Sequence, residues 1–319
     1  MRKLFGTVAL LCVAAAVIMA TPAAAAWPEK GIRVIVPFAP GGSTDNTMRS
    51  IIPALEKVLG VSVTIENVAG GAGLIGVARA MQAKPDGYTF SLNPTSTLAN
   101  LYTRDMPYDY EKDVQPVANL TSSWVAVVVR PDMPVNNLKE FVAYAKANPL
   151  TYASTGVGGI THIYAEAFAA AVGIEMTHVP YRGSSAALNA IMAGHVDVDV
   201  DSNVLPQLPT GAVKGIGYIN DKPWPGYTQL RPLSEQGIQV PQMSWFGLST
   251  QKAAPKEAVE GMAAALEKAM KDEEVVKRLL NLGLYPNYQG TEEFTRQIAE
   301  SQKAFYTVLD RLGMIQKKK

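Results

Sequence analysis

A buried-strand pattern that runs through a glycine turn into a helix start sets the strongest constraint on the fold of this chain. Ile32–Phe38 is an apolar run, Pro40-Gly41-Gly42 predicts a turn, and Ser43-Thr44-Asp45 is typical of the first residues of a helix. The first turn of a helix leaves backbone N–H groups without partners. A glycine turn in front of it therefore predicts a site for an anion.

A second strand–glycine–helix pattern lies far along the chain, at Tyr152–Thr161, and contains Gly156, Gly158 and Gly159. One such loop alone is more often an ordinary strand-to-helix connection, where glycine and serine are common. Two of them favour a pair of anion cradles, one in each of two lobes, facing each other across a cleft at the carboxyl ends of the strands.

Short apolar strands alternate with amphipathic helices through most of the chain. This predicts an α/β fold with a parallel-rich sheet in each of two lobes, right-handed crossovers and helices on both faces. The expected strands are Ile32–Pro37, Ser62–Glu66, Tyr88–Asn93, Val117–Leu120, Val125–Arg130, Leu150–Ser154, Met176–Val179, Val196–Asp201, Val213–Tyr218 and Trp245–Ser249. The expected helices are Thr44–Leu59, Asn137–Ala147 and Thr161–Val172, then three in succession with little strand between them, Pro255–Lys271, Glu273–Asn281 and Glu292–Leu312.

The first residues, Met1–Ala26, have the pattern of a secretory signal peptide. Arg2-Lys3 precedes an apolar run, Leu4–Met19, and Ala24-Ala25-Ala26 fits an A-x-A cleavage site. The run is too short and wrongly flanked for a membrane span. We therefore expect a protein exported to the periplasm and soluble there. Cys12, the single cysteine, would be removed, so the mature chain has no disulfide.

Charge and length bound the classes of partner and the domain count. Without Arg2 and Lys3, the 29 basic residues fall to 27, against 28 acidic residues. This balance gives no reason to expect nucleic acid or an anionic membrane as a partner. The chain that remains after Ala26 is long enough for two lobes with separate cores.

Several motifs in the chain do not fit the sites that they superficially match. Gly71–Gly76 fits G-x-G-x-x-G, but Asn93 stands where a dinucleotide site needs an acid, so the glycines predict a tight turn and close packing, and no cofactor is expected. Asp197, Asp199 and Asp201 share one face of a strand and are expected to be a solvated face, with Asp201 pointing toward the cleft.

The acids of that strand lack the spacing of a calcium loop, and the three histidines (His162, His178 and His195) are scattered. No metal is expected. No G-x-S-x-G elbow or catalytic triad is present, which disfavours an enzyme.

The chain resembles the substrate-binding receptors of tripartite tricarboxylate transporters, also called Bug receptors, over essentially its whole length after Ala26. The stretches that carry the resemblance are Trp27–Asp45, Glu66–Gly76, Pro85–Thr89, Met106–Val117, Tyr152–Gly159, His178–Gly183, Ser244–Leu248 and Ala253–Val259. It departs from the commonest family pattern after Gly159, where Ile160-Thr161 replaces a Thr-Pro pair.

The resemblance implies a type II periplasmic binding fold that closes like a clamshell. Lobe 1 would comprise residues 27–122 and 244–319, and lobe 2 residues 123–243, with hinges near Ser123–Val125 and Met243–Trp245. Family ligands are small organic acids: di- and tricarboxylates, acidic amino acids and some aromatic acids. Backbone amides and waters hold the carboxylate.

The site residues that the resemblance implies come from three segments. They are Phe38, Ala39, Gly42, Ser43 and Asp45 in the first loop, Ser154, Thr155, Gly158 and Gly159 in the second, and Asp201 at a strand end. Arg49, Arg79 and Arg182 are candidate ion partners, although arginines on helix faces are more often solvated.

We therefore expect a monomeric receptor that hands a small carboxylate, a dicarboxylate above all, to a membrane permease. Two alternatives stay open: a sensor input for a membrane kinase, and a hydrolase or isomerase that uses Asp201 near Ser43 in the same cleft.

Overall fold

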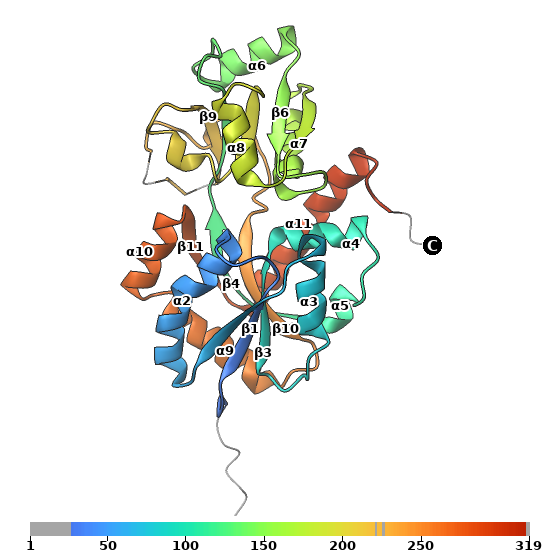
Figure 1. The fold of residues 1–319 in the computed structure, drawn as a ribbon, viewed down its shortest axis with the longest axis vertical. Helices are drawn as coiled ribbons and strands as arrows, with labels where there is room; N and C mark the ends of the chain where they lie inside the picture. Colours follow the sequence, from blue (N-terminus) through green and yellow to red (C-terminus); the bar gives the residue numbers. More distant parts are fainter. Residues whose placement is uncertain (1–26, 221, 225–226, 317–319) are drawn as a thin grey trace, which may run out of the picture.

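The computed structural model describes residues 27–220, 222–224 and 227–316 of this chain. The expected signal peptide, its cleavage site and Cys12 lie outside the described residues. Two sheets, each with helices on both faces, form two lobes stacked along the long axis of the molecule (Figure 1). The predicted two-lobed α/β architecture is confirmed. Among the described helices, none has the length and apolar character needed to cross a bilayer.

The lower lobe in Figure 1 is built on a six-stranded sheet in the order β11-β4-β10-β3-β1-β2. Its strands are β1 (Ile32–Val36), β2 (Val63–Asn67), β3 (Thr89–Pro94), β4 (Val114–Ser123), β10 (Trp245–Gln251) and β11 (Leu284–Gln289). Three helices share a large apolar core with one face: α2 (Ser43–Leu59), α9 (Lys256–Ala269) and α10 (Glu273–Asn281). Three more helices belong to this lobe: α3 (Leu74–Met81), α4 (Asn100–Thr103) and α5 (Tyr110–Asp113).

The upper lobe is built on a five-stranded sheet in the order β7-β6-β8-β5-β9. Its strands are β5 (Val125–Val129), β6 (Thr151–Ser154), β7 (Thr177–Pro180), β8 (Val198–Asp201) and β9 (Lys214–Ile219). Helices α6 (Leu138–Ala147) and α7 (Ile160–Val172) pack on one face, and α8 (Ser184–Met192) packs on the other. All ten strands expected from the sequence are present in these two sheets.

Both sheets are mixed, whereas the alternation predicted parallel-rich sheets. β1 runs parallel to β2 and β3, and β6 runs parallel to β7 and β8, but the other strand pairs are antiparallel. The reason in the lower lobe is the path of the chain. β4 leaves this lobe and β10 returns to it, and two neighbouring strands that leave and return must run in opposite directions.

The edge strand β11 lies between α10 and the last helix, α11 (Thr291–Arg311), where the sequence predicted little strand. Its sequence, LYPNYQ, mixes proline and polar residues with aromatics, so it has no apolar run. Because β11 pairs only with β4, Pro286 can occupy it without breaking a ladder on the outer side.

Two chain segments cross between the lobes and are bonded to each other. Trp124 alone separates β4 from β5, and the returning segment enters β10 after Ser244. The Ser123 N–H donates to the Ser244 carbonyl at 3.1 Å, and Gln242 Nε2 donates to the Ser123 carbonyl at 2.7 Å. The lobe boundaries expected from the sequence stay a prediction.

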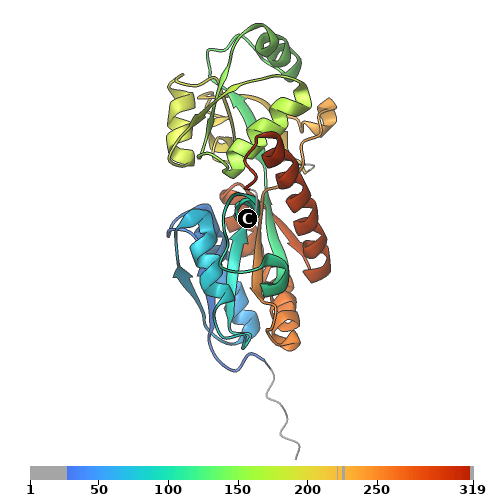
Figure 2. The same cartoon turned by 90° about the vertical axis from the view of Figure 1, so that its right-hand side faces the viewer.

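Helix α11 extends from one lobe to the other (Figure 2). Near its start, Phe294 and Ile298 pack with Trp245 of the lower lobe. Near its end, Phe305 and Leu309 belong to the core of the upper lobe. The helix is therefore a third connection between the lobes, which the sequence analysis assigned wholly to lobe 1.

The acids of β8 do not form the solvated face that the sequence predicted. Asp199 is fully buried and Asp201 is 6% exposed, because α8 covers this face of the sheet with Ala187 and Ala190. Neither carboxyl oxygen of Asp199 has a hydrogen-bond partner among the described residues. Burial therefore raises the pKa of Asp199 well above its usual range.

Asp197, at the other end of this strand, has the opposite environment. Burial pushes its pKa upward, but hydrogen bonds from Thr151 and an ion pair with Arg130 at 3.0 Å outweigh burial and lower the pKa. The charged form of Asp197 is thus stabilised by folding, whereas that of Asp199 is disfavoured.

These environments predict opposite pH dependences for two matched substitutions. A carboxyl group whose pKa is raised in the folded state destabilises the protein as the pH rises above the unfolded pKa of about 4. Asp199→Asn should therefore raise the free energy of unfolding by roughly 1–3 kcal/mol at about pH 8, and this gain should shrink toward about pH 4. Asp197→Asn should lose stability at about pH 8 and recover toward acid. Urea unfolding of both variants across this range measures the two effects. A gain for Asp199→Asn that does not change with pH would contradict the assignment.

Candidate functional site

The first glycine loop presents the start of α2 without a side-chain cap. The chain leaves the buried strand β1, turns through Gly41 at φ +79°, and enters α2 with Gly42 as the N-cap residue. Because glycine has no side chain to accept from the first turn, the N–H groups of Ser43 and Thr44 receive no side-chain cap from the residues that the structure describes. Ser43 is exposed, as a ligand site requires.

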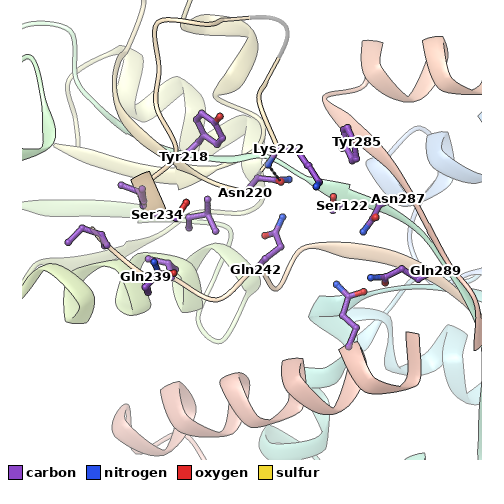
Figure 3. Close-up of a pocket in the computed structure, with 15 residues that line it drawn as sticks. Ser122, Tyr218, Asn220, Lys222, Ser234, Gln239, Gln242, Tyr285, Asn287 and Gln289 are labelled. Atoms are coloured by element: carbon purple, nitrogen blue, oxygen red, sulfur yellow. Dashed lines mark hydrogen bonds between the residues drawn. The ribbon is translucent and has the colours of Figure 1, made fainter. Parts of the chain in front are cut away.

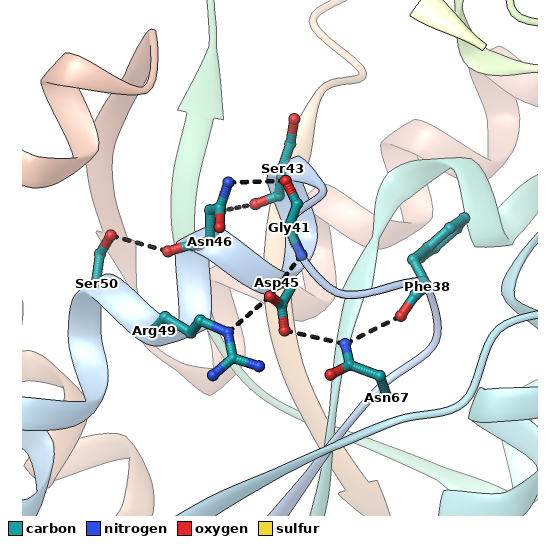
Figure 4. A network of polar contacts seen from close by, with 9 residues as sticks. Phe38, Gly41, Ser43, Asp45, Asn46, Arg49, Ser50 and Asn67 are labelled. Atoms are coloured by element: carbon teal, nitrogen blue, oxygen red, sulfur yellow. Dashed lines mark hydrogen bonds and ion pairs between the residues drawn. The ribbon is translucent and has the colours of Figure 1, made fainter.

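Asp45 holds this loop in shape from inside (Figure 4). Its side chain is buried and accepts three hydrogen bonds: from Gly41 N–H at 2.8 Å, from Arg49 Nε at 2.7 Å and from Asn67 Nδ2 at 2.9 Å. Burial alone would raise the pKa of Asp45, but these three donors lower it below its usual value. Asn67 also donates to the Phe38 carbonyl at 3.0 Å, which fixes the position of Phe38.

The second glycine loop uses most of its own backbone N–H groups internally. Its bonds are Thr155 N–H to Thr161 Oγ1 (2.8 Å), Gly156 N–H to Ser154 Oγ (3.1 Å), Gly158 N–H to His162 Nδ1 (3.0 Å) and Gly159 N–H to the Gly156 carbonyl (3.1 Å). Of this loop, the Val157 N–H and the first turn of α7 are left without an acceptor in the described part of the chain. These backbone amides were expected from the sequence to bind a ligand. In this conformation they instead form hydrogen bonds that stabilise the loop itself.

A cavity of about 600 Å³ between the lobes is lined by Phe38 of the first loop and by Thr155–Ile160 of the second. Of the sequence-predicted residues, Phe38, Thr155, Gly158 and Gly159 line it. Ala39, Gly42, Ser43, Asp45, Ser154 and Asp201 are not among its lining residues.

Asp201 accepts hydrogen bonds from the backbone N–H groups of Ser202 (2.7 Å) and Asn203 (3.3 Å), and burial raises its pKa. It therefore supports the loop after β8 and is buried there.

A third segment lines the cavity and escaped the sequence analysis. It follows β3 and contributes Ser96, Ala99, Asn100, Thr103 and Arg104, and the end of the chain adds Met314 and Gln316. A signal was present, because strand β3 runs through Pro94 directly into a helical turn, as in the other two loops. It lacked the glycines that drew attention to those loops.

Arg104 supplies the charge of this cavity. It is the one charged side chain among the lining residues that the structure describes, and it is exposed. Two of the three arginines singled out from sequence are committed elsewhere: Arg49 pairs with Asp45, and Arg79 pairs with Glu66 at 2.7 Å. Arg182 is exposed and is not among the lining residues of the cavity. No cluster of three potential metal ligands occurs among the described residues.

The Gly71–Gly76 stretch packs behind the first loop, as the sequence analysis interpreted it. A Cβ on Gly76 would lie 2.6 Å from the Pro37 Cα, and one on Gly73 would lie 3.2 Å from the Phe38 ring. Ala72 adopts a left-handed φ of +54°, and Asn100 Nδ2 donates to its carbonyl at 3.2 Å. These glycines allow the close approach that sets Phe38 against the cavity.

A second, smaller cavity of about 430 Å³ lies at the lobe crossing (Figure 3). Side-chain amides dominate its wall, but several are used to tie the crossing together. Asn220 Nδ2 and Gln242 Nε2 both donate to the Ser123 carbonyl, and Asn119 Nδ2 donates to Gln289 Oε1. Neither glycine loop contributes to it. The candidate site is therefore the larger cavity.

Comparison with known proteins supports a receptor. Residues 47–314 match the model of the tripartite tricarboxylate transporter family receptor. A UPF0065 protein of Cupriavidus necator is 30% identical over 291 residues, covering 90% of this chain and 89% of that protein.

Two solved structures from Rhodopseudomonas palustris have the same fold. One, with adipate, is 26% identical with a TM-score of 0.77 and covers 90% of this chain and 98% of its own. MatC, with bound malate, is 28% identical with a TM-score of 0.74 and covers 89% of this chain and all of its own. With a family match over most of its length and a two-lobed fold around a cavity, the chain belongs to the receptor family of the tripartite tricarboxylate transporters.

Proposed function

We propose that this protein is a periplasmic solute-binding receptor that captures a small carboxylate between its lobes and delivers it to a tripartite tricarboxylate-type permease. One observation carries the proposal. The cavity between the lobes is lined by Phe38 of the first glycine loop, by Thr155–Ile160 of the second, and by Arg104, the one charged side chain among the described lining residues. Its volume of about 600 Å³ suits a small organic acid.

The arrangement favours a dicarboxylate. Arg104 presents a planar fork of donors to one carboxylate from the lower lobe. The first turn of α7, behind Gly159, offers unpaired N–H groups and the positive end of a helix dipole to the other. Adipate and malate, the acids bound by two relatives, each carry two carboxyl groups.

Closure of the lobes would complete the site. Hydrogen bonds to a charged group contribute roughly 1.5–3 kcal/mol each, so three or four of them reach the roughly 8 kcal/mol of a micromolar complex. In the proposed closed form, Ser43 and the start of α2 swing onto the ligand. The closed shape, absent from the open receptor, is what a permease would recognise. The residues assigned from sequence to the two lobes would move as units about the crossing at Ser123 and Ser244.

We propose that the bound acid is not converted. The groups that a hydrolase would recruit have structural roles: Ser154 Oγ bonds within its loop, and His162 Nδ1 accepts from Gly158 N–H. Asp201, the base of the enzyme alternative, is buried beside its own backbone donors. We further propose export by the Met1–Ala26 signal peptide and a monomeric mature protein.

Direct titration tests this function. The purified mature protein, as a monomer, should bind one or more acids of a panel that includes succinate, L-malate, adipate, citrate and benzoate, with micromolar affinity, because charged hydrogen bonds of the expected number supply about that free energy. Calorimetry and the upward shift in melting temperature both report binding. The acid should be recovered unchanged from the complex. No response to any carboxylate would contradict the proposal.

The role of Arg104 has its own test. Arg104→Gln should lower the affinity for the tightest-binding acid by roughly 10- to 100-fold, because a charge-assisted hydrogen bond contributes about 1.5–3 kcal/mol. Arg79→Gln is the matched control, since Arg79 is paired with Glu66 outside the cavity, and it should bind within about threefold of wild type. Equal affinities for wild type and Arg104→Gln would remove Arg104 from the site.

A further inference from the structure

Two of the three histidines stack against each other directly behind the second glycine loop. The rings of His162, on α7, and His178, on β7, have centroids 3.9 Å apart and planes 9° from parallel. The Tyr152 ring of β6 lies beside both imidazoles, with its centroid 5.0 Å from that of His178 and 6.1 Å from that of His162. His162 is 5% exposed, Tyr152 is fully buried and His178 is half-buried in the upper lobe.

Each imidazole bonds one end of the loop. His178 Nε2 lies 2.6 Å from Ser154 Oγ, the hydroxyl that also accepts from Gly156 N–H. His162 Nδ1 lies 3.0 Å from Gly158 N. The loop that these two contacts hold contributes Thr155–Ile160 to the upper-lobe wall of the cavity.

The contact with Gly158 defines the protonation state of His162. A backbone N–H can only donate, so Nδ1 must carry its lone pair and the ring must be neutral with its proton on Nε2. A proton on Nδ1 would place two donors face to face at 3.0 Å, and the Gly158 amide would lose its acceptor. Protonation and the present loop conformation are therefore incompatible.

We propose that His162 and His178 are positioning residues that hold the second glycine loop in its binding conformation, and that the His162 contact requires a neutral ring, so that protonation of His162 releases the loop. The inference rests on the proposed function of this cavity.

The surroundings of the stack support neutrality. Burial lowers the pKa of His162 to about 4, and His178 beside it acts in the same direction. Burial also lowers the pKa of His178. The titratable and charged groups facing the stack are Tyr152 and Glu166, which hydrogen bond to each other at 2.6 Å, and Arg311 of α11, which pairs with Glu166 at 3.2 Å.

Glu166 opposes this effect because its charge favours a protonated imidazole. Its two oxygens bond Tyr152 and Arg311, which offsets that pull. A positive ring would also attract an anionic ligand. The proposal predicts that the loss of the loop contact outweighs this attraction, so that protonation lowers the affinity for the ligand.

Two substitutions of His162 separate the hydrogen bond from the ring. His162→Asn keeps an acceptor within reach of Gly158 N–H but cannot titrate, whereas His162→Phe keeps a stacked ring but has no acceptor. With L-malate and adipate as probes at about pH 7.5, His162→Phe should bind roughly tenfold more weakly than wild type, and His162→Asn within about threefold.

The pH dependence of ligand affinity distinguishes the proposal from a merely structural role of His162, which would not change that dependence. With a His162 pKa of about 4, half of the ligand-free protein is protonated at His162 at about pH 4, and this weakens binding about twofold if only the neutral form binds. Between about pH 7.5 and 4, the wild-type affinity should therefore fall about twofold more than that of His162→Asn. Protonation of the probe itself affects both proteins equally. Identical profiles, or tighter binding by wild type in acid, would overturn the inference.

A ligand-free measurement keeps the inference separate from the proposed function. In wild-type protein, the Gly158 amide should be protected from hydrogen exchange at neutral pH and should shift in the NMR spectrum together with the His162 ring signals as acid is added. His195, which is exposed, is the internal reference. If no carboxylate ligand binds to wild type or to any variant, but the Gly158 and His162 signals shift together as the pH falls, the proposed function fails and the positioning role stands. If the two signals move independently, the positioning role fails.

Discussion

The satisfaction of backbone N–H groups in two glycine loops is the constraint on which the site depends. A loop between a strand and a helix has no strand neighbour to bond, so side chains supply acceptors for its amides. Asp45 accepts from Gly41 in the first loop, and Thr161 and His162 accept from Thr155 and Gly158 in the second. Each acceptor comes from the first turn of the helix that follows its loop, so the helix start and the cavity wall are built as one unit. The few amides left over are then available to a ligand.

Three connections join the lobes. Two crossing segments meet at Ser123 and Ser244, where backbone and side-chain amides hold them together. Helix α11 adds a third connection, because its first half packs on the lower lobe and its last turns enter the core of the upper lobe. An ion pair between Arg311 and Glu166 fastens that end. The proposed closure about this crossing would have to bend or shift α11, which would tie the geometry of the cavity to the last helix of the chain.

Much of the fold follows from local sequence, and the site follows less completely. Apolar runs such as Val125–Val129 identify strands because a strand buried on both faces leaves no room for polar residues. β11 lacks such a run, since an edge strand needs fewer apolar contacts. Periodicity placed Asp199 on one face of β8 but did not reveal that α8 covers this face. Arg104 and Asn100 reach the cavity through tertiary packing of a loop without glycines, and spacing along the chain carries no information on that.

The central claim is that a carboxylate occupies the cavity formed by Phe38, Arg104 and the Thr155–Ile160 loop. A crystal structure of the mature protein with the tightest-binding acid of the panel tests it most directly. The account predicts a carboxylate within hydrogen-bond distance of the Arg104 guanidinium, with the ligand enclosed by both lobes. An acid found instead in the smaller cavity at the crossing, beside Asn220 and Gln242, would contradict it.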